Sequence, residues 1–186
     1  AHFNLASALA DAGDIPGAVV QYSCGGRAFG PEAVGYQDAV AKKAMRPDSI
    51  FQIMSMTKPV TAVGIMMLVE EGKVSLTAPV EQYLPAFKGV NKKGRAPVVR
   101  DLLTHRSGLA GNAAWPSLST PRPLLEHVPA AYARERNDFY GGAASPTWTA
   151  KAGERYQYSN LGIATLGYLV ETTNPDRLSF SEYVQR

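Results

Sequence analysis

Cysteine and histidine are scarce in this 186-residue chain, and their scarcity excludes several kinds of chemistry. The single cysteine, Cys24, permits no intrachain disulfide and leaves no cysteine-based zinc site. The three histidines are His2, His105 and His127, and neither a His-Glu-x-x-His motif nor a cluster of carboxylates accompanies them. We therefore expect no metal ion and no other cofactor.

Long apolar runs and a strong excess of one charge are also missing. The longest apolar run, Val60 to Val69, is too short to span a bilayer. Lys and Arg number 19 against 16 Asp and Glu, and the one basic knot, 92–95, is typical of a solvated loop rather than a nucleic-acid-binding face. The chain shows no signal-peptide pattern, and its composition leaves open a cytoplasmic or a periplasmic location.

The composition, 45% hydrophobic and 19% charged, is that of a folded globular protein. Near the start, Leu5 to Ala12 predicts a helix that ends at Gly13. The segments 17–24 and 27–36 are rich in strand-forming residues, and Gly25-Gly26 between them tolerates positive φ. This pattern predicts an antiparallel hairpin.

The rest of the chain reads as mainly helical. From Pro59 to Glu71, apolar residues cover nearly every side of a helical wheel, which predicts a helix buried within the protein. Near the C-terminus, Ser179-Phe-Ser-Glu182 has the pattern of a capping box, yet only four residues follow it. We therefore expect the natural protein to continue beyond Arg186. Further helices are predicted over 98–105, 124–136 and 161–171.

A serine and a lysine stand together where the apolar helix begins, in the stretch Ser55-Met-Thr-Lys58-Pro59. Proline is tolerated in the first helical turn, so Pro59 places residues 55–58 at the helix N-terminus. Residues three apart share a helix face, which brings Ser55 and Lys58 into contact. Burial and the positive helix end both favour a neutral amine that can accept the serine proton, and free backbone N–H groups can stabilise an oxyanion. The alternative is that Ser55 only caps the helix while Lys58 extends into solvent.

A second polar group, Tyr158-Ser159-Asn160, precedes the last apolar helix. In a functional interpretation, the Tyr158 phenol points into the Ser55–Lys58 pair, where a nearby cation favours phenolate and lets it share the proton transfers. Asn160 would then orient the Lys58 amine or a substrate carbonyl or amide. In the structural alternative, Ser159 or Asn160 caps the helix and Tyr158 is a packed aromatic.

These motifs and their order resemble the serine hydrolases of the class C β-lactamase superfamily, with their penicillin-binding-protein relatives and the family VIII carboxylesterases. The combination of Ser-Met-Thr-Lys and Tyr-Ser-Asn is more similar to the carboxylesterases than to the dedicated β-lactamases. Further matching segments follow the order of that family: 46–51, 68–72, 83–85, 102–109 and 153–155.

The resemblance implies an α/β fold of α+β type, β-lactamase/transpeptidase-like, with an antiparallel sheet flanked by helices and a mostly helical region. Residues 1–54 would supply the N-terminal helix and hairpin, and residues 55–186 the nucleophile helix and the helical region. It also implies an acyl-enzyme mechanism on a small-molecule ester or amide, with Ser55 as nucleophile, Lys58 and Tyr158 as bases, and Asn160 binding substrate. Two alternatives stay open: a β-lactamase or D-amino-acid peptidase that uses the same residues, and a catalytically silent module that binds acyl or peptidoglycan-like ligands.

One element of the resemblance is missing from the sequence. The family carries a third motif near its C-terminus, of Lys-Thr-Gly, His-x-Gly or Trp-x-Gly type, and no such tripeptide occurs here. We therefore expect the C-terminal strands and last helix of the fold to lie outside this chain, so that half of the oxyanion hole is absent unless a second chain supplies it. Loss of one oxyanion donor typically lowers kcat by about 10²- to 10³-fold.

A Ser-His-Asp hydrolase is the remaining alternative. The chain has no Gly-x-Ser-x-Gly elbow, which disfavours the α/β-hydrolase fold. Of the histidines, His105 ends a predicted helix, where an imidazolium suits the helix dipole. A structural role is therefore the expectation for this residue.

Overall fold

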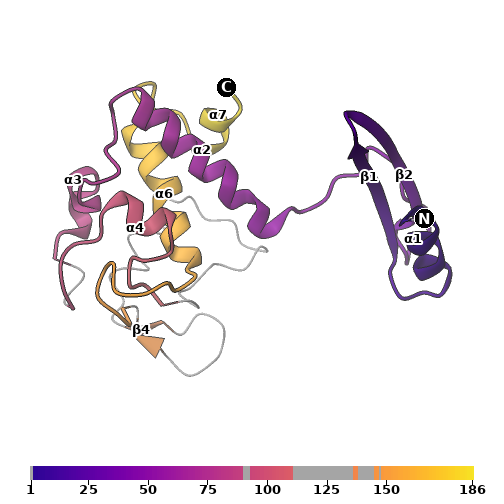
Figure 1. Cartoon of the computed structure of the whole chain (residues 1–186), viewed down its shortest axis with the longest axis horizontal. Coiled ribbons are helices and arrows are strands. Elements are labelled where there is room, and N and C mark those ends of the chain that lie inside the picture. The colour runs from indigo at the N-terminus through magenta and orange to yellow at the C-terminus, as the bar shows by residue number, and fades with distance from the viewer. Residues whose placement is uncertain (1, 90–92, 111–135, 138–144, 147) are drawn as a thin grey trace. The chain divides into compact units, whose positions relative to one another are not determined.

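A computed structural model of the chain describes residues 2–89, 93–110, 136–137, 145–146 and 148–186 (Figure 1). Contacts between residues divide it into two compact units, Ala1–Ile53 and Met54–Arg186. Each unit has its own secondary structure, and the two are described in turn.

The first unit is a helix beside a small antiparallel sheet. Helix α1 (His2–Asp11) contacts strands β1 (Gly17–Cys24) and β2 (Arg27–Asp38), and the short strand β3 (Lys43–Ala44) completes the sheet in the order β1-β2-β3. The predicted hairpin is confirmed, because β1 pairs antiparallel with β2 from Gly17 opposite Gly35 to Cys24 opposite Arg27.

Glycines shape this unit where the backbone requires positive φ. Gly25 and Gly26 have φ of 56° and 76°, the left-handed conformation that a two-residue hairpin turn needs at both positions. Gly13 ends the α1 turn with φ of 78°, as predicted, although α1 begins earlier than Leu5.

The second unit is a group of helices around one apolar core. Helices α2 (Thr57–Glu70), α4 (Val99–Leu103) and α7 (Phe180–Val184) contact the long helix α6 (Asn160–Thr173), as Figure 1 shows. The largest fully buried side chains of the core come from these helices and adjoining segments: Ile65, Leu68, Val99, Leu102, Leu109, Leu161, Leu166, Leu169, Val170 and Tyr183.

Shorter elements complete the second unit. The η1 turn (Met54–Met56) leads into α2, and α3 (Val80–Tyr83) is followed by the η2 turn (Pro85–Phe87). Strands β4 (Arg136–Asn137) and β5 (Ser145–Pro146) form an antiparallel pair. The helix predicted over 124–136 lies outside the described residues, except that Arg136 begins β4.

The predicted helices over 98–105 and 161–171 correspond to α4 and α6. The predicted capping box is confirmed at the start of α7, where Ser179 Oγ accepts the Glu182 N–H and the Glu182 carboxylate accepts the Ser179 N–H. None of the described helices is long and apolar enough to cross a membrane.

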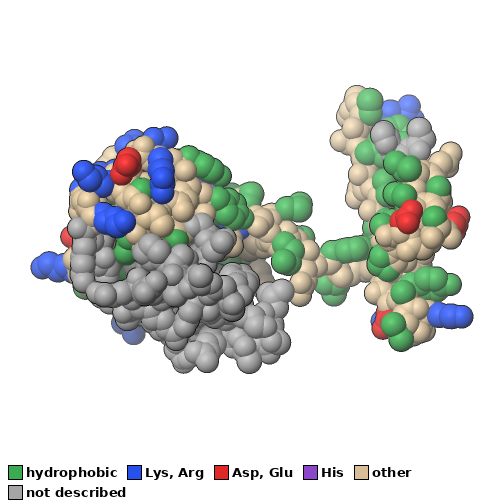
Figure 2. Space-filling model, turned by 90° about the horizontal axis from the view of Figure 1, so that it is seen from below, with side chains coloured by type: hydrophobic (Ala, Val, Ile, Leu, Met, Phe, Trp, Pro, Cys, Tyr) green, Lys and Arg blue, Asp and Glu red, His purple; other side chains and the backbone are tan. Residues whose placement is uncertain are grey.

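Within the second unit, α2 is buried on one side only, and its predicted burial on all sides stays a prediction. Its buried residues, Thr61, Gly64, Ile65 and Leu68, share one face, where α6 and α7 pack. On the opposite side, Val63 is 59% exposed, and Figure 2 shows apolar side chains open on the surface of the larger unit. The helical wheel shows that α2 is apolar on nearly every side, but tertiary packing within this unit covers only one of its faces.

Asn174 ties the end of α6 to the segment that leads into α7. Its buried side chain donates from Nδ2 to the carbonyls of Val170 at 2.8 Å, Glu171 at 3.1 Å and Leu178 at 2.9 Å, and its Oδ1 accepts the Leu178 N–H at 2.8 Å. Each buried polar group left without a partner costs about 1–3 kcal/mol. The side chain therefore holds α7 against α6.

We expect Asn174→Ala to lower the free energy of unfolding by about 3 kcal/mol, measured by urea denaturation followed by circular dichroism. Thr172→Ala is the matched control, because its exposed hydroxyl bonds only carbonyls of its own helix, and the change should stay within about 0.5 kcal/mol. Equal unfolding curves for Asn174→Ala and the unmodified chain would contradict this assignment.

Candidate active site

Ser55 stands in the η1 turn immediately before α2. Met54, the residue before it, has φ of 47°, a left-handed backbone that non-glycine residues adopt rarely. The N-cap of α2 is Met56, and no side chain caps the helix there. The alternative in which Ser55 serves as the helix cap is therefore wrong.

Two side chains converge on the Ser55 hydroxyl, and we call Ser55, Lys58 and Tyr158 the Ser55 cluster. Lys58 Nζ donates a hydrogen bond to Ser55 Oγ at 3.0 Å, which confirms the contact predicted from their spacing. Tyr158 Oη lies 2.7 Å from the same Oγ, and either oxygen can be the donor. Lys58 Nζ also lies 4.7 Å from the centre of the Tyr158 ring. The serine oxygen thus lies between an amine and a phenol.

The cluster is more open to solvent than the sequence indicated. Ser55 is exposed, Lys58 is half-buried and Tyr158 is 38% exposed. Within the second unit, the buried face of α2 begins only at Thr61, so the packing of the first helical turn into a core stays a prediction. The neutral state of the Lys58 amine stays a prediction.

The Tyr158 phenol is electrostatically altered by its neighbours. Hydrogen bonding with Lys58 has the largest effect and lowers the pKa of Tyr158 from its ordinary value, and hydrogen bonding with Ser55 acts in the same direction. Burial opposes this shift, while the positive charge of Lys58 adds to it. The phenolate is therefore easier to form here than in a free tyrosine, which suits a general base.

The segment that carries Tyr158 also starts α6. Ser159 is fully buried and caps the helix, because its Oγ accepts the Gly162 N–H at 3.2 Å. Ser159 therefore caps α6, as the structural alternative allowed, while Tyr158 faces Ser55; a share of Tyr158 in the proton transfers stays a prediction. Asn160 is the half-buried first residue of α6, and among the described residues its side chain forms no hydrogen bond to the Ser55 cluster. Its substrate-binding role stays a prediction.

The same segment is held against the chain that follows α4. Gly108, with φ of 85°, leaves no room for a side chain, because a Cβ there would lie 2.3 Å from the Ala150 carbonyl oxygen. The Thr149 N–H donates to the Gly108 carbonyl at 2.9 Å, and the Gly153 N–H donates to the Arg106 carbonyl at 2.7 Å. This close approach brings the segment before Tyr158 alongside residues 106–108.

His105 is the residue near the site that sequence reasoning undervalued. Its ring centre lies 4.7 Å from that of Tyr158, and its Nδ1 accepts the Ser159 N–H at 3.1 Å. Burial, and then the positive charge of Lys58, lower the pKa of His105. The imidazolium expected from the helix dipole is therefore disfavoured, because Nδ1 must be unprotonated to accept a hydrogen bond. The signal in the sequence that could have identified His105 is the segment 102–109, which matches the family pattern.

Of the other two histidines, His2 begins α1 in the first unit, and His127 lies outside the described residues.

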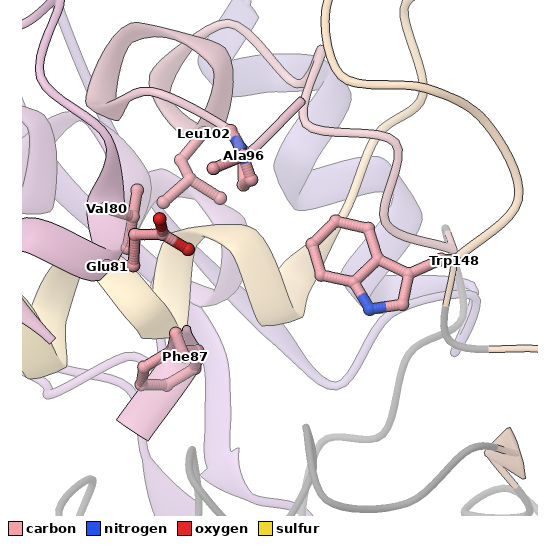
Figure 3. A pocket seen from close by; sticks show the side chains of 7 residues that line it. Val80, Glu81, Phe87, Ala96, Leu102 and Trp148 are labelled. Carbon is pink, nitrogen blue, oxygen red and sulfur yellow. The ribbon is translucent and has the colours of Figure 1, made fainter. Parts of the chain in front are cut away.

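A small hollow elsewhere in the second unit is lined by Val80, Phe87, Leu102 and Trp148, with the Glu81 carboxylate at its side (Figure 3). None of the Ser55 cluster lines it.

Comparison with known proteins places this geometry in a family. The chain is 27% identical over 173 residues to Protein flp of Staphylococcus aureus, a match that covers 92% of this chain and 32% of that protein. It superposes with a TM-score of 0.76 on EstCE1, described as a hydrolase with promiscuous acyltransferase activity, at 24% identity, with 98% of this chain and 48% of that one covered.

The octameric penicillin-binding protein homologue from Pyrococcus abyssi aligns with a TM-score of 0.74 at 28% identity, over 99% of this chain and 40% of its own. The chain thus spans about a third of that curated relative and under half of these two solved structures. The fold is β-lactamase/transpeptidase-like, with helices and an antiparallel sheet, as predicted. Because the Beta-lactamase family matches residues 4–186, nearly the whole chain, the protein belongs to that family of serine hydrolases.

Proposed function

We propose that the protein is a carboxylesterase that works through an acyl-enzyme on Ser55. Ser55 Oγ attacks the ester carbonyl carbon while its proton passes to Lys58 or Tyr158. The bond to the alcohol oxygen then breaks, and the alcohol leaves with a proton returned by the same groups. Water hydrolyses the acyl-serine, releasing the carboxylic acid and restoring the Ser55 hydroxyl.

The observation that carries this proposal is the double contact at Ser55 Oγ, with Lys58 Nζ at 3.0 Å and Tyr158 Oη at 2.7 Å. A nucleophile within hydrogen-bonding distance of a base that a third group orients is the arrangement of activated serine enzymes. Family membership supports hydrolysis as the reaction class. The preference for esters rests on the Ser-Met-Thr-Lys and Tyr-Ser-Asn motifs.

Two further functions remain candidates because they use the same residues. A β-lactamase or D-amino-acid peptidase is favoured by the family match and would differ only in the substrate that the pocket accepts. A silent binding module is favoured by the missing third motif, because an incomplete oxyanion hole slows both acylation and deacylation. In our proposal Asn160 orients the substrate, and a second chain supplies the missing strands where activity requires them.

We expect the chain to release p-nitrophenol from p-nitrophenyl butyrate and to act more slowly on a chromogenic cephalosporin. Turnover of the cephalosporin alone would reverse this order, since the pocket would then select the lactam. Intact-protein mass spectrometry adds a second measurement, in which a persistent butyryl adduct without turnover would identify a silent acyl-binding protein. Ser55→Ala is the control for both, and release or labelling that survives it would contradict Ser55 as the nucleophile.

A further inference from the structure

We propose that His105 is the positioning residue of this site, because its imidazole and its carbonyl hold the backbone on both sides of Tyr158 and thereby set the phenol against Ser55. This inference rests on the proposed function, since it assigns His105 a role that acts through Tyr158. Nothing in the motif pattern alone requires it.

His105 contacts the residues on both sides of the phenol and the phenol ring itself. Its Nδ1 accepts the N–H of Ser159 at 3.1 Å, and its carbonyl oxygen accepts the N–H of Gln157 at 2.7 Å. Between these two hydrogen bonds, the His105 and Tyr158 rings lie 4.7 Å apart at an angle of 31°. The residues before and after Tyr158 are thus both bonded to one residue, which limits how far the phenol can move.

His105 is itself held by the core. It follows the C-terminus of α4, and its N–H donates to the carbonyl of Leu102, a residue that is 1% exposed. The buried Asp101 holds the other end of α4, accepting hydrogen bonds from Arg95 at 2.6 and 3.1 Å and from the Val98 N–H at 2.9 Å. His105 therefore follows a short helix that is held in place at both ends.

The hydrogen bond from the Ser159 N–H to His105 Nδ1, which we call the anchor, forms only while the imidazole is neutral. An N–H cannot be accepted by a protonated Nδ1, so this contact places the ring proton on Nε2. The charged and titratable groups around the ring favour that state: Lys58 approaches from α2, the Tyr156 and Tyr158 rings lie against it, and Arg106 follows it in the chain. A positive imidazole would lie near the Lys58 cation, and its protonated Nδ1 would face the Ser159 N–H, so that two donors would oppose each other.

The backbone of His105 determines which substitution removes the side chain cleanly. Its φ of 55° is left-handed, so alanine would add strain, whereas glycine adopts this conformation readily. Asparagine also tolerates it and can offer Oδ1 near the position of Nδ1, without the ring. His105→Gly thus deletes the anchor, and His105→Asn restores its acceptor atom.

The test compares both variants with the unmodified chain in two measurements. The first is the rate of Ser55 acylation by p-nitrophenyl butyrate, followed by intact-protein mass spectrometry. The second is the pH titration of tyrosinate absorbance, with Tyr158→Phe as the blank that isolates the Tyr158 phenol. Arg177→Gly is the matched control, because Arg177 is exposed and also has a left-handed φ, of 56°.

We expect His105→Gly to slow acylation by about 10- to 100-fold, since a misplacement of about 1 Å can lower a rate by about 10²-fold. The Tyr158 titration should move to higher pH, because the phenol leaves its hydrogen bonds with Lys58 and Ser55. His105→Asn should recover both values to within about 5-fold in rate, and Arg177→Gly should change neither.

Unchanged acylation and an unchanged Tyr158 titration in His105→Gly would overturn the proposal, as would an asparagine variant as defective as the glycine one. If the unmodified chain fails to acylate at Ser55, the proposed function fails, while the Tyr158 titration still tests His105. If His105→Gly does not fold, ¹⁵N NMR of the unmodified chain decides. A neutral ring protonated at Nε2 supports the anchor, and a ring protonated at Nδ1 near neutral pH refutes it.

Discussion

Replacement of Lys58 by alanine is expected to lower the rate of Ser55 acylation by about 10³-fold, within the range of about 10² to 10⁴ for loss of a general base. The amine nitrogen lies 3.0 Å from Ser55 Oγ and is the nearest nitrogen base that can take the serine proton in the described cluster. Stopped-flow measurement of p-nitrophenol release from p-nitrophenyl butyrate gives the rate. The fold should be retained, since the lost side chain is half-buried and its contacts with Ser55 and Tyr158 lie outside the apolar core.

The same variant changes Tyr158 in a way that can be measured separately. Hydrogen bonding with Lys58 is the largest cause that lowers the pKa of Tyr158, so this pKa should rise toward 10.0 in Lys58→Ala. Lys73→Ala, which removes an exposed lysine just beyond the other end of α2, is the matched control and should leave rate and titration unchanged. Full acylation in Lys58→Ala would remove this residue from the mechanism.

Replacement of Tyr158 by phenylalanine is expected to slow acylation by about 10²-fold while the protein stays folded. The substitution removes the oxygen 2.7 Å from Ser55 Oγ but keeps the ring beside His105. Tyr156→Phe is the matched control, because Tyr156 lies two residues earlier, is 63% exposed and also contacts the His105 ring. Thermal unfolding and steady-state kinetics of the two variants separate the loss of the phenol oxygen from any loss of packing.

The pH dependence gives the Tyr158 prediction a direction. Because the pKa of Tyr158 is lowered, its phenolate forms at a lower pH than in a free tyrosine, and acylation should rise with pH below the ordinary value of 10.0. Tyr158→Phe should lose this rise, and Lys58→Ala should move it to higher pH. A rise of the same size and midpoint in Tyr158→Phe would show that another group titrates.

Local features of the sequence predicted the parts of this site that are close along the chain. The spacing of Ser55 and Lys58, with Pro59 after them, indicated their contact, because one helical turn fixes which residues share a face. The Gly25-Gly26 pair likewise indicated the hairpin, because a two-residue turn requires positive φ. For Tyr158, the decisive argument was the resemblance to a family, since spacing alone cannot bring together residues 103 positions apart.

Tertiary structure decided which side chains of different helices meet. Periodicity showed that α2 is apolar on nearly every side, but only the packing of α6 and α7 determines that Ile65 lies on the side buried within the second unit. The position of His105 depends on how α4 meets the start of α6, which brings its Nδ1 to the Ser159 N–H across 54 positions. The sequence by itself determined the local pairing of nucleophile and amine through helix geometry. The packing of α2, α4 and α6 decided how the Tyr158 phenol and the His105 imidazole meet that pair. Such long-range contacts depend on the shapes of whole helix faces rather than on residue spacing.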